Sequence, residues 1–277
     1  MTDSARENTT GTVPSYTLGD GTTIPAIGLG TYGLRGSAGA ASIAGAIGLG
    51  YRLIDTAYSY DNEDAVGEGI RQSGINPAEL LVTSKVPNGH HGRDRTLAAF
   101  DTTMQRLGLD TLDLLLIHWP EPQDGLYVET WQALVELRQQ GRVRSIGVSN
   151  FDGEQLDRII DASGMTPSVN QVPVDLARPN RVAREANAAR GVLTESYSPL
   201  KFSEQLAKHP LMTRIAGSHG VTTNQVVLRW HVQSGNVPIP RSRSLEHQRE
   251  NFDVFGFELS AQELGELDEI SGTPGGI

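Results

Sequence analysis

The sequence predicts one α/β domain folded as a (β/α)8 TIM barrel. Short apolar runs alternate with longer helical patterns from residue 26 to residue 252, an alternation typical of a parallel sheet covered by helices. Eight such units fit into about 250 residues, which is the usual size of this barrel. No Pro-, Gly- or Ser-rich linker divides the chain of 277 residues. We therefore expect a single domain over residues 15–277, preceded by a flexible polar tail, 1–14.

The first element expected is a small hairpin before the barrel. Two short extended pieces flank Gly19-Asp20-Gly21, and an Asp-Gly pair is a hairpin signal. We expect this hairpin to close the bottom of the barrel.

The barrel strands and helices follow from the apolar pattern. Near-continuous apolar runs such as LDLLLI favour strands that are covered on both faces. The expected strands are 26–30, 52–57, 80–85, 112–118, 143–149, 168–172, 192–197 and 236–240. The expected helices are 38–49, 61–73, 94–107, 126–140, 153–162, 180–190, 204–219 with 222–234, and 245–252. Ser260 and Glu263 form a capping box, which predicts an extra C-terminal helix over 260–270.

Composition excludes several classes of function. A net charge of −10 argues against a nucleic-acid surface, which needs a basic face. No apolar run approaches the length of a membrane-spanning helix. From the charge we expect no nucleic acid as a partner, and from the lack of a long apolar run we expect no membrane. The absence of cysteine excludes disulfides and thiolate chemistry, and it fits a cytoplasmic protein. The seven histidines show no ligand-like spacing with acids, so no metal is expected.

One short stretch favours a different fold. Residues 28–33 read GLGTYG, which matches the G-x-G-x-x-G fingerprint of a Rossmann dinucleotide-binding turn. A strand-like run precedes it, a helical run follows it, and Asp55 stands about twenty residues further on, where a ribose-binding acid is expected. A Rossmann domain, however, uses about six strands and usually leaves a second domain. Eight undivided units favour the barrel.

Ionisable residues stand at the ends of three predicted strands. Asp55, Lys85 and His118 occupy positions where an apolar residue would be the default, and Tyr60 follows Asp55 in the next loop. Each has a structural interpretation: an ion pair of Asp55 with Lys85, a core histidine, or a tyrosine that caps the loop. Because the carboxyl ends of barrel strands carry the chemistry of this fold, all four side chains are expected at one mouth.

These four residue types can reduce a carbonyl group. The ordinary pKa of tyrosine, near 10, is too high for efficient proton transfer at neutral pH. We expect the Lys85 ammonium to lower the pKa of Tyr60, because an opposite charge can shift a pKa by roughly 1 to 3 units. Asp55 would keep Lys85 charged and oriented, and His118 would donate a hydrogen bond to the substrate carbonyl. Tyr60 would then be the general acid.

At this point the chain resembles a known family. The blocks GLGTY, IDTAYSYDNE, TSK, LLLIHWP, GVSNF, VNQV, SYSPL and IPRS…ENF look like the aldo-keto reductases and run in that family's order from about residue 16 to 259. Within that family, the chain looks most like the bacterial reductases related to 2,5-diketo-gluconate reductase. The resemblance implies an NADPH-dependent oxidoreductase that reduces small aldehydes, α-dicarbonyls or keto-sugars by hydride transfer from the nicotinamide. It also implies a monomer.

The resemblance assigns a cofactor site. Its residues are Gly30, Thr31, Tyr32, Asp55, Ser149, Asn150, Gln171, Tyr197, Ser198, Pro199, Leu200, Arg241, Ser242, Arg243, His247, Glu250 and Asn251. Within this set, the residues at 149, 150 and 171 would surround the nicotinamide carboxamide, and Tyr197 would stack on the ring. Residues 198–200 would follow the pyrophosphate. The segment 241–243 would hold the 2′-phosphate, with residues 250 and 251 near the adenine.

The chain departs from the family pattern in ways that affect specificity. His247 stands where an arginine often grips the phosphate, and a neutral side chain there would weaken NADPH preference by about 1–2 kcal/mol. Use of NADH is therefore possible. Tyr32, Tyr60, His118 and Trp119 are the expected substrate pocket. A short loop after His118 predicts an open mouth and permissive specificity.

Two alternatives belong to other classes. Tyr197 and Lys201 show the Y-x-x-x-K spacing of short-chain dehydrogenases, but Pro199 between them is disfavoured inside a helix. The second alternative is a barrel that binds NADPH without turnover. The presence of all four catalytic residue types argues against it.

Overall fold

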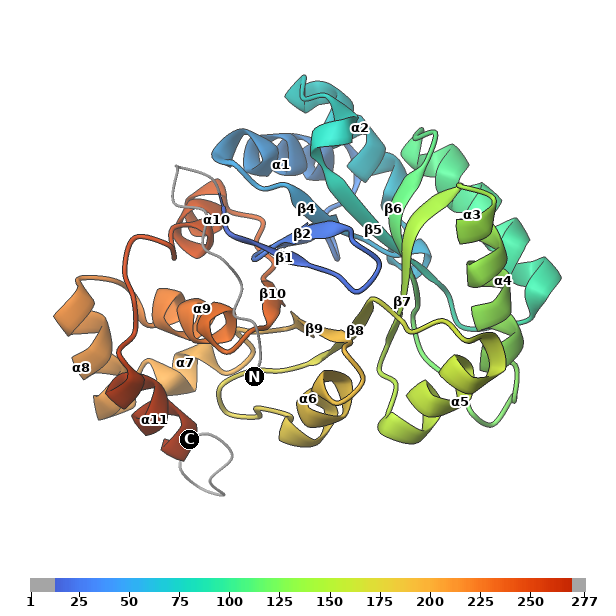
Figure 1. Cartoon of the computed structure of the whole chain (residues 1–277). Helices are drawn as coiled ribbons and strands as arrows, with labels where there is room; N and C mark the ends of the chain where they lie inside the picture. The colour runs from blue at the N-terminus through green and yellow to red at the C-terminus, as the bar shows by residue number, and fades with distance from the viewer. Residues whose placement is uncertain (1–12, 271–277) are drawn as a thin grey trace.

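A computed structural model describes residues 13–270 of the chain. Eight parallel strands form one sheet in the order β10-β9-β8-β7-β6-β5-β4-β3. Gly28 N donates to Pro238 O at 3.0 Å and Gly30 N donates to Pro240 O at 2.9 Å, so the first and last strands meet. Figure 1 shows the helices arranged around this sheet. The predicted (β/α)8 barrel is confirmed.

The elements follow the predicted order. The barrel strands are β3 Leu29–Gly30, β4 Leu53–Asp55, β5 Leu81–Val86, β6 Leu112–Ile117, β7 Val143–Ser149, β8 Val169–Pro173, β9 Leu193–Tyr197 and β10 Val237–Ile239. The surrounding helices are α1 Gly36–Leu49, α2 Glu63–Ser73, α3 Arg93–Leu107, α4 Tyr127–Gln139, α5 Gly153–Ser163, α6 Arg181–Ala188, α9 Thr223–Gln233 and α10 Leu245–Phe252. Two short 3₁₀ helices, η1 Tyr58–Tyr60 and η2 Pro77–Glu79, were not expected.

The inside of the barrel changes from apolar to polar along its axis. Its apolar part consists of Leu53, Leu81, Leu114, Leu116, Val169, Val237 and Ile239. Successive side chains of a strand point to opposite faces, so residues two apart share a face. Asp55 therefore lies above Leu53, Lys85 above Thr83 and Leu81, and Gln171 above Val169. This alternation places the polar residues together at the carboxyl ends of the strands.

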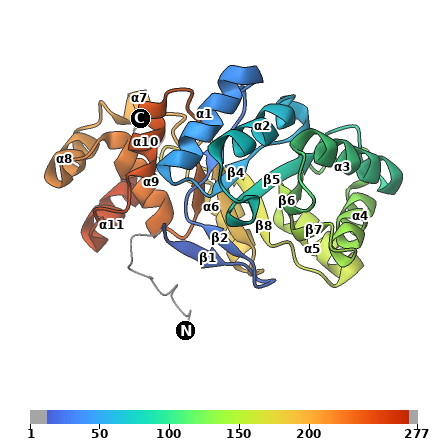
Figure 2. The ribbon, with the colours of Figure 1, turned by 90° about the horizontal axis from the view of Figure 1, so that it is seen from above.

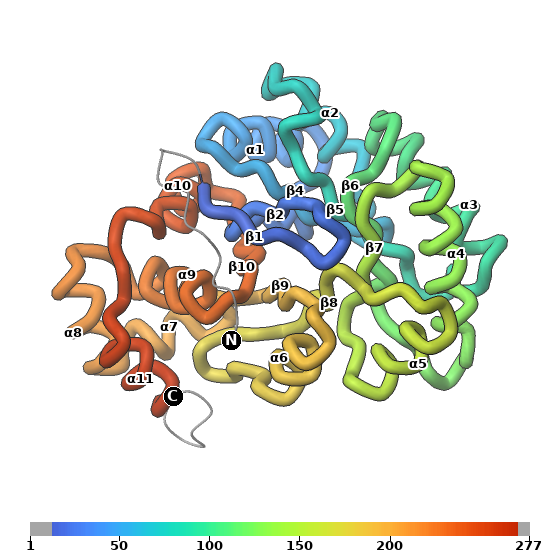
Figure 3. The backbone as a smooth tube through the Cα atoms, viewed as in Figure 1, coloured from blue at the N-terminus to red at the C-terminus, as the bar shows by residue number. Residues whose placement is uncertain are grey.

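The predicted hairpin covers the opposite end of the barrel. Strands β1 Ser15–Thr17 and β2 Thr23–Pro25 pair antiparallel across the amino ends of the barrel strands (Figures 1 and 3). Figure 2 shows this hairpin at one end of the molecule. Leu18 and Ile24 join the interior apolar cluster, and Asp20 accepts a hydrogen bond from Ser168 at 3.0 Å. The expectation of a closed bottom is confirmed.

Close packing and backbone conformation in the barrel explain the glycines at 28 and 33. The Rossmann interpretation of residues 28–33 is therefore wrong. A Cβ on Gly28 would lie 2.7 Å from side-chain atoms of Leu53 and Ile239, so any larger residue would force these side chains to move. Gly33 has a φ of +77°, a conformation that favours glycine. Asp55 points into the barrel with the polar residues described above.

The helices after β9 differ in one place from the prediction, and the predicted C-terminal helix is present. The predicted helix 204–219 is broken into α7 Ser203–Leu206 and α8 Pro210–His219. Pro210 has no N–H to continue a helix, but it fits the first helical position, and the His209 ring accepts from Leu211 N. The last helix, α11 Ala261–Ile270, has the predicted capping box between Ser260 and Glu263.

Parts of the domain prediction lie outside the described residues, namely most of the tail 1–14 and the stretch 271–277. Across residues 13–270, no helix combines the length and the apolar character required to span a bilayer.

Candidate active site

A cavity of about 530 Å³ opens at the carboxyl ends of the barrel strands. It is lined by Gly30, Thr31, Tyr32, Asp55, Tyr60, His118, Trp119, Ser149, Asn150, Gln171, Tyr197, Ser198, Pro199, Leu200, Lys201, Ile239, Pro240 and Arg241. Its volume lies in the range of small-molecule sites. Most residues predicted for the catalytic and nicotinamide sites therefore share one cavity.

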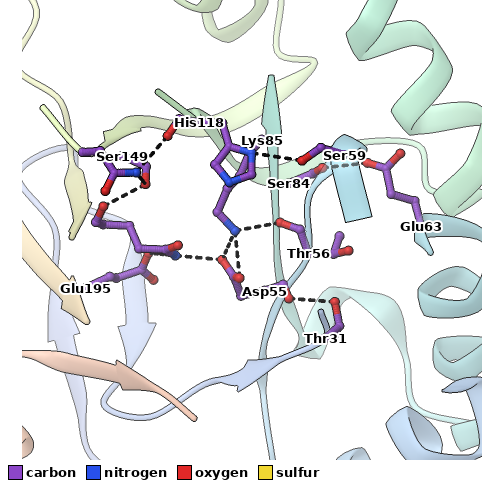
Figure 4. A network of polar contacts seen from close by, with 12 residues as sticks. Thr31, Asp55, Thr56, Ser59, Glu63, Ser84, Lys85, His118, Ser149 and Glu195 are labelled. Carbon is purple, nitrogen blue, oxygen red and sulfur yellow. Dashed lines mark hydrogen bonds and ion pairs between the residues drawn. The ribbon is translucent and has the colours of Figure 1, made fainter. Parts of the chain in front are cut away.

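A buried ion pair forms the floor of this cavity. Lys85 Nζ donates to Asp55 Oδ1 at 2.8 Å, to Asp55 Oδ2 at 2.7 Å and to Thr56 O at 2.9 Å (Figure 4). Lys85 is 1% exposed and Asp55 is 3% exposed. Burial is the largest single influence and lowers the pKa of Lys85, but the charges of Asp55 and Tyr60 and the hydrogen bond to Asp55 together outweigh it and leave that pKa raised. Lys85 is therefore an ammonium, held by Asp55 as the sequence predicts.

Tyr60 lies next to this ammonium at the end of η1. Arg35 fixes the backbone there, because its Nε and Nη2 donate to Tyr60 O at 3.1 and 2.9 Å. Lys85 Nζ is 5.1 Å from the centroid of the Tyr60 ring. Burial raises the pKa of Tyr60 and outweighs the lowering by Lys85, while the charge of Asp55 raises it further.

The expectation that Lys85 brings the pKa of Tyr60 below its ordinary value is thus wrong for the protein alone. The sequence shows that a cation is near, but the cost of ionising a buried phenol decides the direction. A raised pKa keeps Tyr60 protonated at neutral pH, which is the form that a proton donor requires.

His118 faces Tyr60 from the end of β6. The two ring centroids are 5.8 Å apart and nearly perpendicular. Burial, followed by the charge of Lys85, lowers the pKa of His118 to about 3. The imidazole is therefore neutral and has one N–H donor and one acceptor nitrogen. It can donate a hydrogen bond but carries no charge.

Amide and hydroxyl groups line the adjoining wall. Ser149 at the end of β7 is paired in register with Gln171 on β8, and Ser149 Oγ donates to Gln171 O at 2.8 Å. Tyr197 Oη donates to Asn150 Oδ1 at 3.0 Å, which joins β9 to this group. Gln171 Nε2 donates to Asp55 Oδ2 at 2.8 Å and to Glu195 Oε2 at 3.0 Å. The side-chain oxygen Oε1 of Gln171 is then the atom left to meet a ligand.

Sequence reasoning missed the buried acid Glu195. It is fully buried, and burial together with the charge of Asp55 raises its pKa to about 8. The signal was present in the strand period, because Glu195 stands two residues before Tyr197 and shares its face. Thr56, whose carbonyl accepts from Lys85, and Lys201, which lines the cavity, were also missed.

The expected phosphate-binding segment lies beside the cavity. Arg241 Nη1 donates to Tyr32 O at 3.1 Å, and Arg243 Nη2 donates to Gly33 O at 3.4 Å. Ser244 caps α10 by accepting from His247 N at 3.3 Å. The predicted residues Ser242, Arg243, His247, Glu250 and Asn251 are not in the cavity wall.

Strained backbone concentrates at this end of the barrel. Five non-glycine residues of the described chain have a positive φ, and each follows the carboxyl end of a barrel strand: Asp61, Glu121, Asn150, Asn180 and Ser198. Such conformations cost about 1–3 kcal/mol each and are typical of functional sites.

Aromatic side chains form an open mouth. Tyr32 is 59% exposed and Trp119 is 44% exposed, whereas Trp131 is fully buried in the core as expected. Tyr32 packs edge-on against Tyr60 with centroids 5.1 Å apart. Tyr197 ends a strand and does not lie on a helix, so the short-chain dehydrogenase interpretation is wrong.

Within the described ranges, no group of three or more His, Asp and Glu side chains is arranged to hold a metal ion. A reaction without a metal stays a prediction.

Comparison with known proteins agrees with this geometry. A model of the Aldo/keto reductase family matches residues 26–272. The 2,5-diketo-D-gluconic acid reductase B of Corynebacterium sp. (strain SHS752001) is 46% identical over 260 residues, covering 94% of this chain and 93% of the relative. The morphine 6-dehydrogenase of Pseudomonas putida is 43% identical over 272 residues, covering 94% and 92%.

Solved structures show the same fold. An aldo/keto reductase from Brucella melitensis has a TM-score of 0.90 and 40% identity, covering 93% of this chain and 99% of that chain. A variant of Gox0644 in complex with NADPH has a TM-score of 0.89 and 40% identity, covering 94% of each chain.

Proposed function

The chain belongs to the aldo/keto reductase family of oxidoreductases, and from this premise we propose that it reduces aldehydes and ketones with NADPH, Tyr60 being the proton donor. The observation that carries the proposal is the contact of a protonated Tyr60 with a buried ammonium. Lys85, paired with Asp55, lies 5.1 Å from the centroid of the Tyr60 ring, and the centroid of the neutral His118 ring lies 5.8 Å from it.

The residues present fit a nicotinamide dinucleotide. Hydroxyl and amide groups of Ser149, Asn150 and Gln171 suit both ends of a carboxamide, and the side-chain oxygen Oε1 of Gln171 is free to accept its N–H. Arg241 and Arg243 offer guanidinium groups to phosphate beside the amino end of α10. When bound, the cofactor supplies the hydride that the carbonyl carbon receives. NADPH-bound Gox0644 supports NADPH as this cofactor.

Tyr60 would give its phenolic proton to the carbonyl oxygen as that oxygen gains charge. The O–H bond of Tyr60 breaks, the new O–H bond forms on the substrate, and the phenolate remains beside Lys85. The ammonium stabilises this phenolate, and its effect is strong because the pair is buried. His118 would donate a second hydrogen bond to the same oxygen. Together these groups act on charge that develops in the transition state.

The pKa shift of Tyr60 gives the two directions different pH dependence. Because burial raises that pKa, the donor stays protonated across the neutral range and reduction loses its acid only at alkaline pH. Alcohol oxidation needs the phenolate, so its rate should rise with pH.

The open aromatic mouth supports small aldehydes, α-dicarbonyls and keto-sugars as substrates. Tyr32 and Trp119 provide flat apolar walls and leave the carbonyl site accessible. The substrates for which the diketogluconic acid reductase and the morphine dehydrogenase are named differ widely, which fits a permissive pocket.

The test is the rate of NADPH and NADH oxidation with phenylglyoxal, a reactive α-dicarbonyl. We expect turnover with NADPH and a slower rate with NADH. Tight binding of both cofactors without turnover of a dicarbonyl, an aldehyde or a keto-sugar would instead support a barrel that binds NADPH and does not catalyse. A monomeric, cytoplasmic protein stays a prediction, tested by size-exclusion chromatography with light scattering and by cell fractionation.

A further inference from the structure

The hydroxyl of Ser59 lies against the ring of the catalytic histidine. Ser59 Oγ is 3.2 Å from His118 Nδ1, and Figure 4 shows the two side chains pointing toward each other. Within residues 13–270, the His118 ring forms this hydrogen bond through Nδ1, and its Nε2 forms no hydrogen bond. Nδ1 is thus engaged with the protein, and Nε2 is the nitrogen left for a ligand.

A neutral histidine must place its single proton on one of these nitrogens. Burial and Lys85 keep His118 neutral, with a pKa of about 3. If the Ser59 hydroxyl donates to Nδ1, the proton lies on Nε2 and can be donated to a carbonyl oxygen. If Ser59 accepts from Nδ1–H, Nε2 presents a lone pair that repels the same oxygen. The direction of the hydrogen bond between Ser59 Oγ and His118 Nδ1 therefore decides whether the histidine can help reduction.

We propose that Ser59 is a positioning residue, whose hydroxyl donates to Nδ1 of His118 and fixes the tautomer with the proton on Nε2. The proposal rests on the proposed function, in which Tyr60 and His118 both donate to the substrate oxygen.

The 3₁₀ helix η1 places Ser59 and Tyr60 together. Tyr60 N donates to Ala57 O at 3.0 Å, which closes the turn. Arg35 holds the carbonyl of Tyr60, and the Arg106 guanidinium lies 4.5 Å from the Tyr58 ring centroid. One anchored turn thus aims the proton donor at the site and presents the neighbouring hydroxyl to the histidine.

The direct test is nitrogen NMR of protein labelled with ¹⁵N-histidine, without cofactor or substrate. The His118 signals are identified by their loss in His118→Asn, which separates them from the other six histidines. We expect a protonated Nε2 and an unprotonated Nδ1 at pH 8. A proton on Nδ1 in the native protein would overturn the proposal. This readout does not depend on turnover, so an inactive enzyme would refute the proposed function and leave the tautomer result standing.

Three variants change the hydrogen bond in different ways. Ser59→Ala removes it and should mix the tautomers and lower kcat by roughly 3- to 10-fold, the effect of a neutral hydrogen bond. Ser59→Thr keeps the hydroxyl and should retain the Nε2–H tautomer, with kcat above that of Ser59→Ala. Ser59→Asp accepts from Nδ1–H, so it should move the proton to Nδ1 and lower kcat by roughly 100-fold or more.

The aspartate variant is assayed at pH 8 because the added charge also raises the pKa of the histidine. An opposite charge shifts a pKa by roughly 1 to 3 units, so His118, starting from a pKa of about 3, stays neutral at pH 8. Thermal midpoints and NADPH affinities of all three variants are measured beside kcat, since a general structural effect would change them together. Unchanged tautomers and kcat in Ser59→Ala and Ser59→Asp would refute the role of Ser59.

Discussion

Removing the carboxylate of Asp55 should destabilise the protein in a way that depends on pH. Asp55→Asn removes the carboxylate that faces the buried Lys85 ammonium. Outside residue 55, Lys85 Nζ then donates a hydrogen bond to Thr56 O at 2.9 Å. Removing one partner of a buried ion pair costs about 3–5 kcal/mol of unfolding free energy. The protein can limit this cost by releasing the proton of Lys85.

The cost of releasing that proton sets a ceiling on the destabilisation. A lysine of ordinary pKa, near 10.4, loses its proton at a cost of about 4.6 kcal/mol at pH 7 and about 1.9 kcal/mol at pH 9. In the native protein the pKa of Lys85 is raised, so its stabilising contribution is complete throughout this window and is lost only at more alkaline pH. In the variant the folded pKa falls below the unfolded one, so stability rises with pH.

Urea unfolding of the native protein and the variant at pH 7 and pH 9 measures this difference. We expect a loss of at least about 3 kcal/mol and no more than about 4.6 kcal/mol at pH 7, and at most about 2 kcal/mol at pH 9. Asp101→Asn is the control, since Asp101 is 61% exposed and pairs with Arg142 at the surface; it should show a much smaller loss at both values. Glu195 also acts on Lys85, so Asp55→Asn is repeated with Glu195→Gln. An equal loss at pH 7 and pH 9 in both backgrounds would refute the reasoning.

Three other predictions follow from single contacts. Burial holds the pKa of His118 at about 3, so between about pH 3 and 6.5 the unfolded chain binds a proton at this residue that the folded protein does not, and the free energy of unfolding falls with acid. Between pH 7 and pH 5, His118→Asn should therefore lose about 2 kcal/mol less of this free energy than the native protein does. An equal loss in the two proteins would contradict this. Gly28→Ala places a Cβ 2.7 Å from two side chains and should lower the free energy of unfolding in urea by about 1–3 kcal/mol. Gly48→Ala is the control, because no atom lies within 4 Å of its added Cβ, and it should raise that free energy by up to about 1 kcal/mol. Equal effects would disprove the packing argument. His247→Arg should raise the NADPH-to-NADH ratio of kcat/KM by roughly 5- to 30-fold, and an unchanged ratio would place the 2′-phosphate elsewhere.

Strands such as β5 and β6 were predictable because an apolar run ends in a polar residue. Lys85 after LVTS and His118 after DLLLI both fall at the carboxyl end of a strand, and a parallel barrel brings such ends together. The break of the predicted helix 204–219 was missed, although Pro210 signals it, since proline cannot continue a helix. The capping box at Ser260 was predicted and is present.

Properties that depend on summed burial were not predictable. The direction of the Tyr60 pKa shift is a difference between desolvation and the opposing effects of Lys85 and Asp55, and the sequence shows only the charges. The strand period could have placed Glu195 on the face of Tyr197, but the sequence shows neither the burial nor the partners that raise its pKa. Ser59 is exposed and unremarkable in sequence, and only the fold places it beside a ring 59 residues away.

The central claim is that Tyr60 donates the proton in carbonyl reduction, and Tyr60→Phe tests it most directly. NADPH affinity is measured by fluorescence titration, and single-turnover oxidation of bound NADPH is followed with phenylglyoxal. We expect affinity to stay within about twofold of the native value and the rate to fall by roughly 100- to 10,000-fold, the usual contribution of a general acid. A variant that binds NADPH and keeps most of its rate would contradict the account and assign the proton to another group.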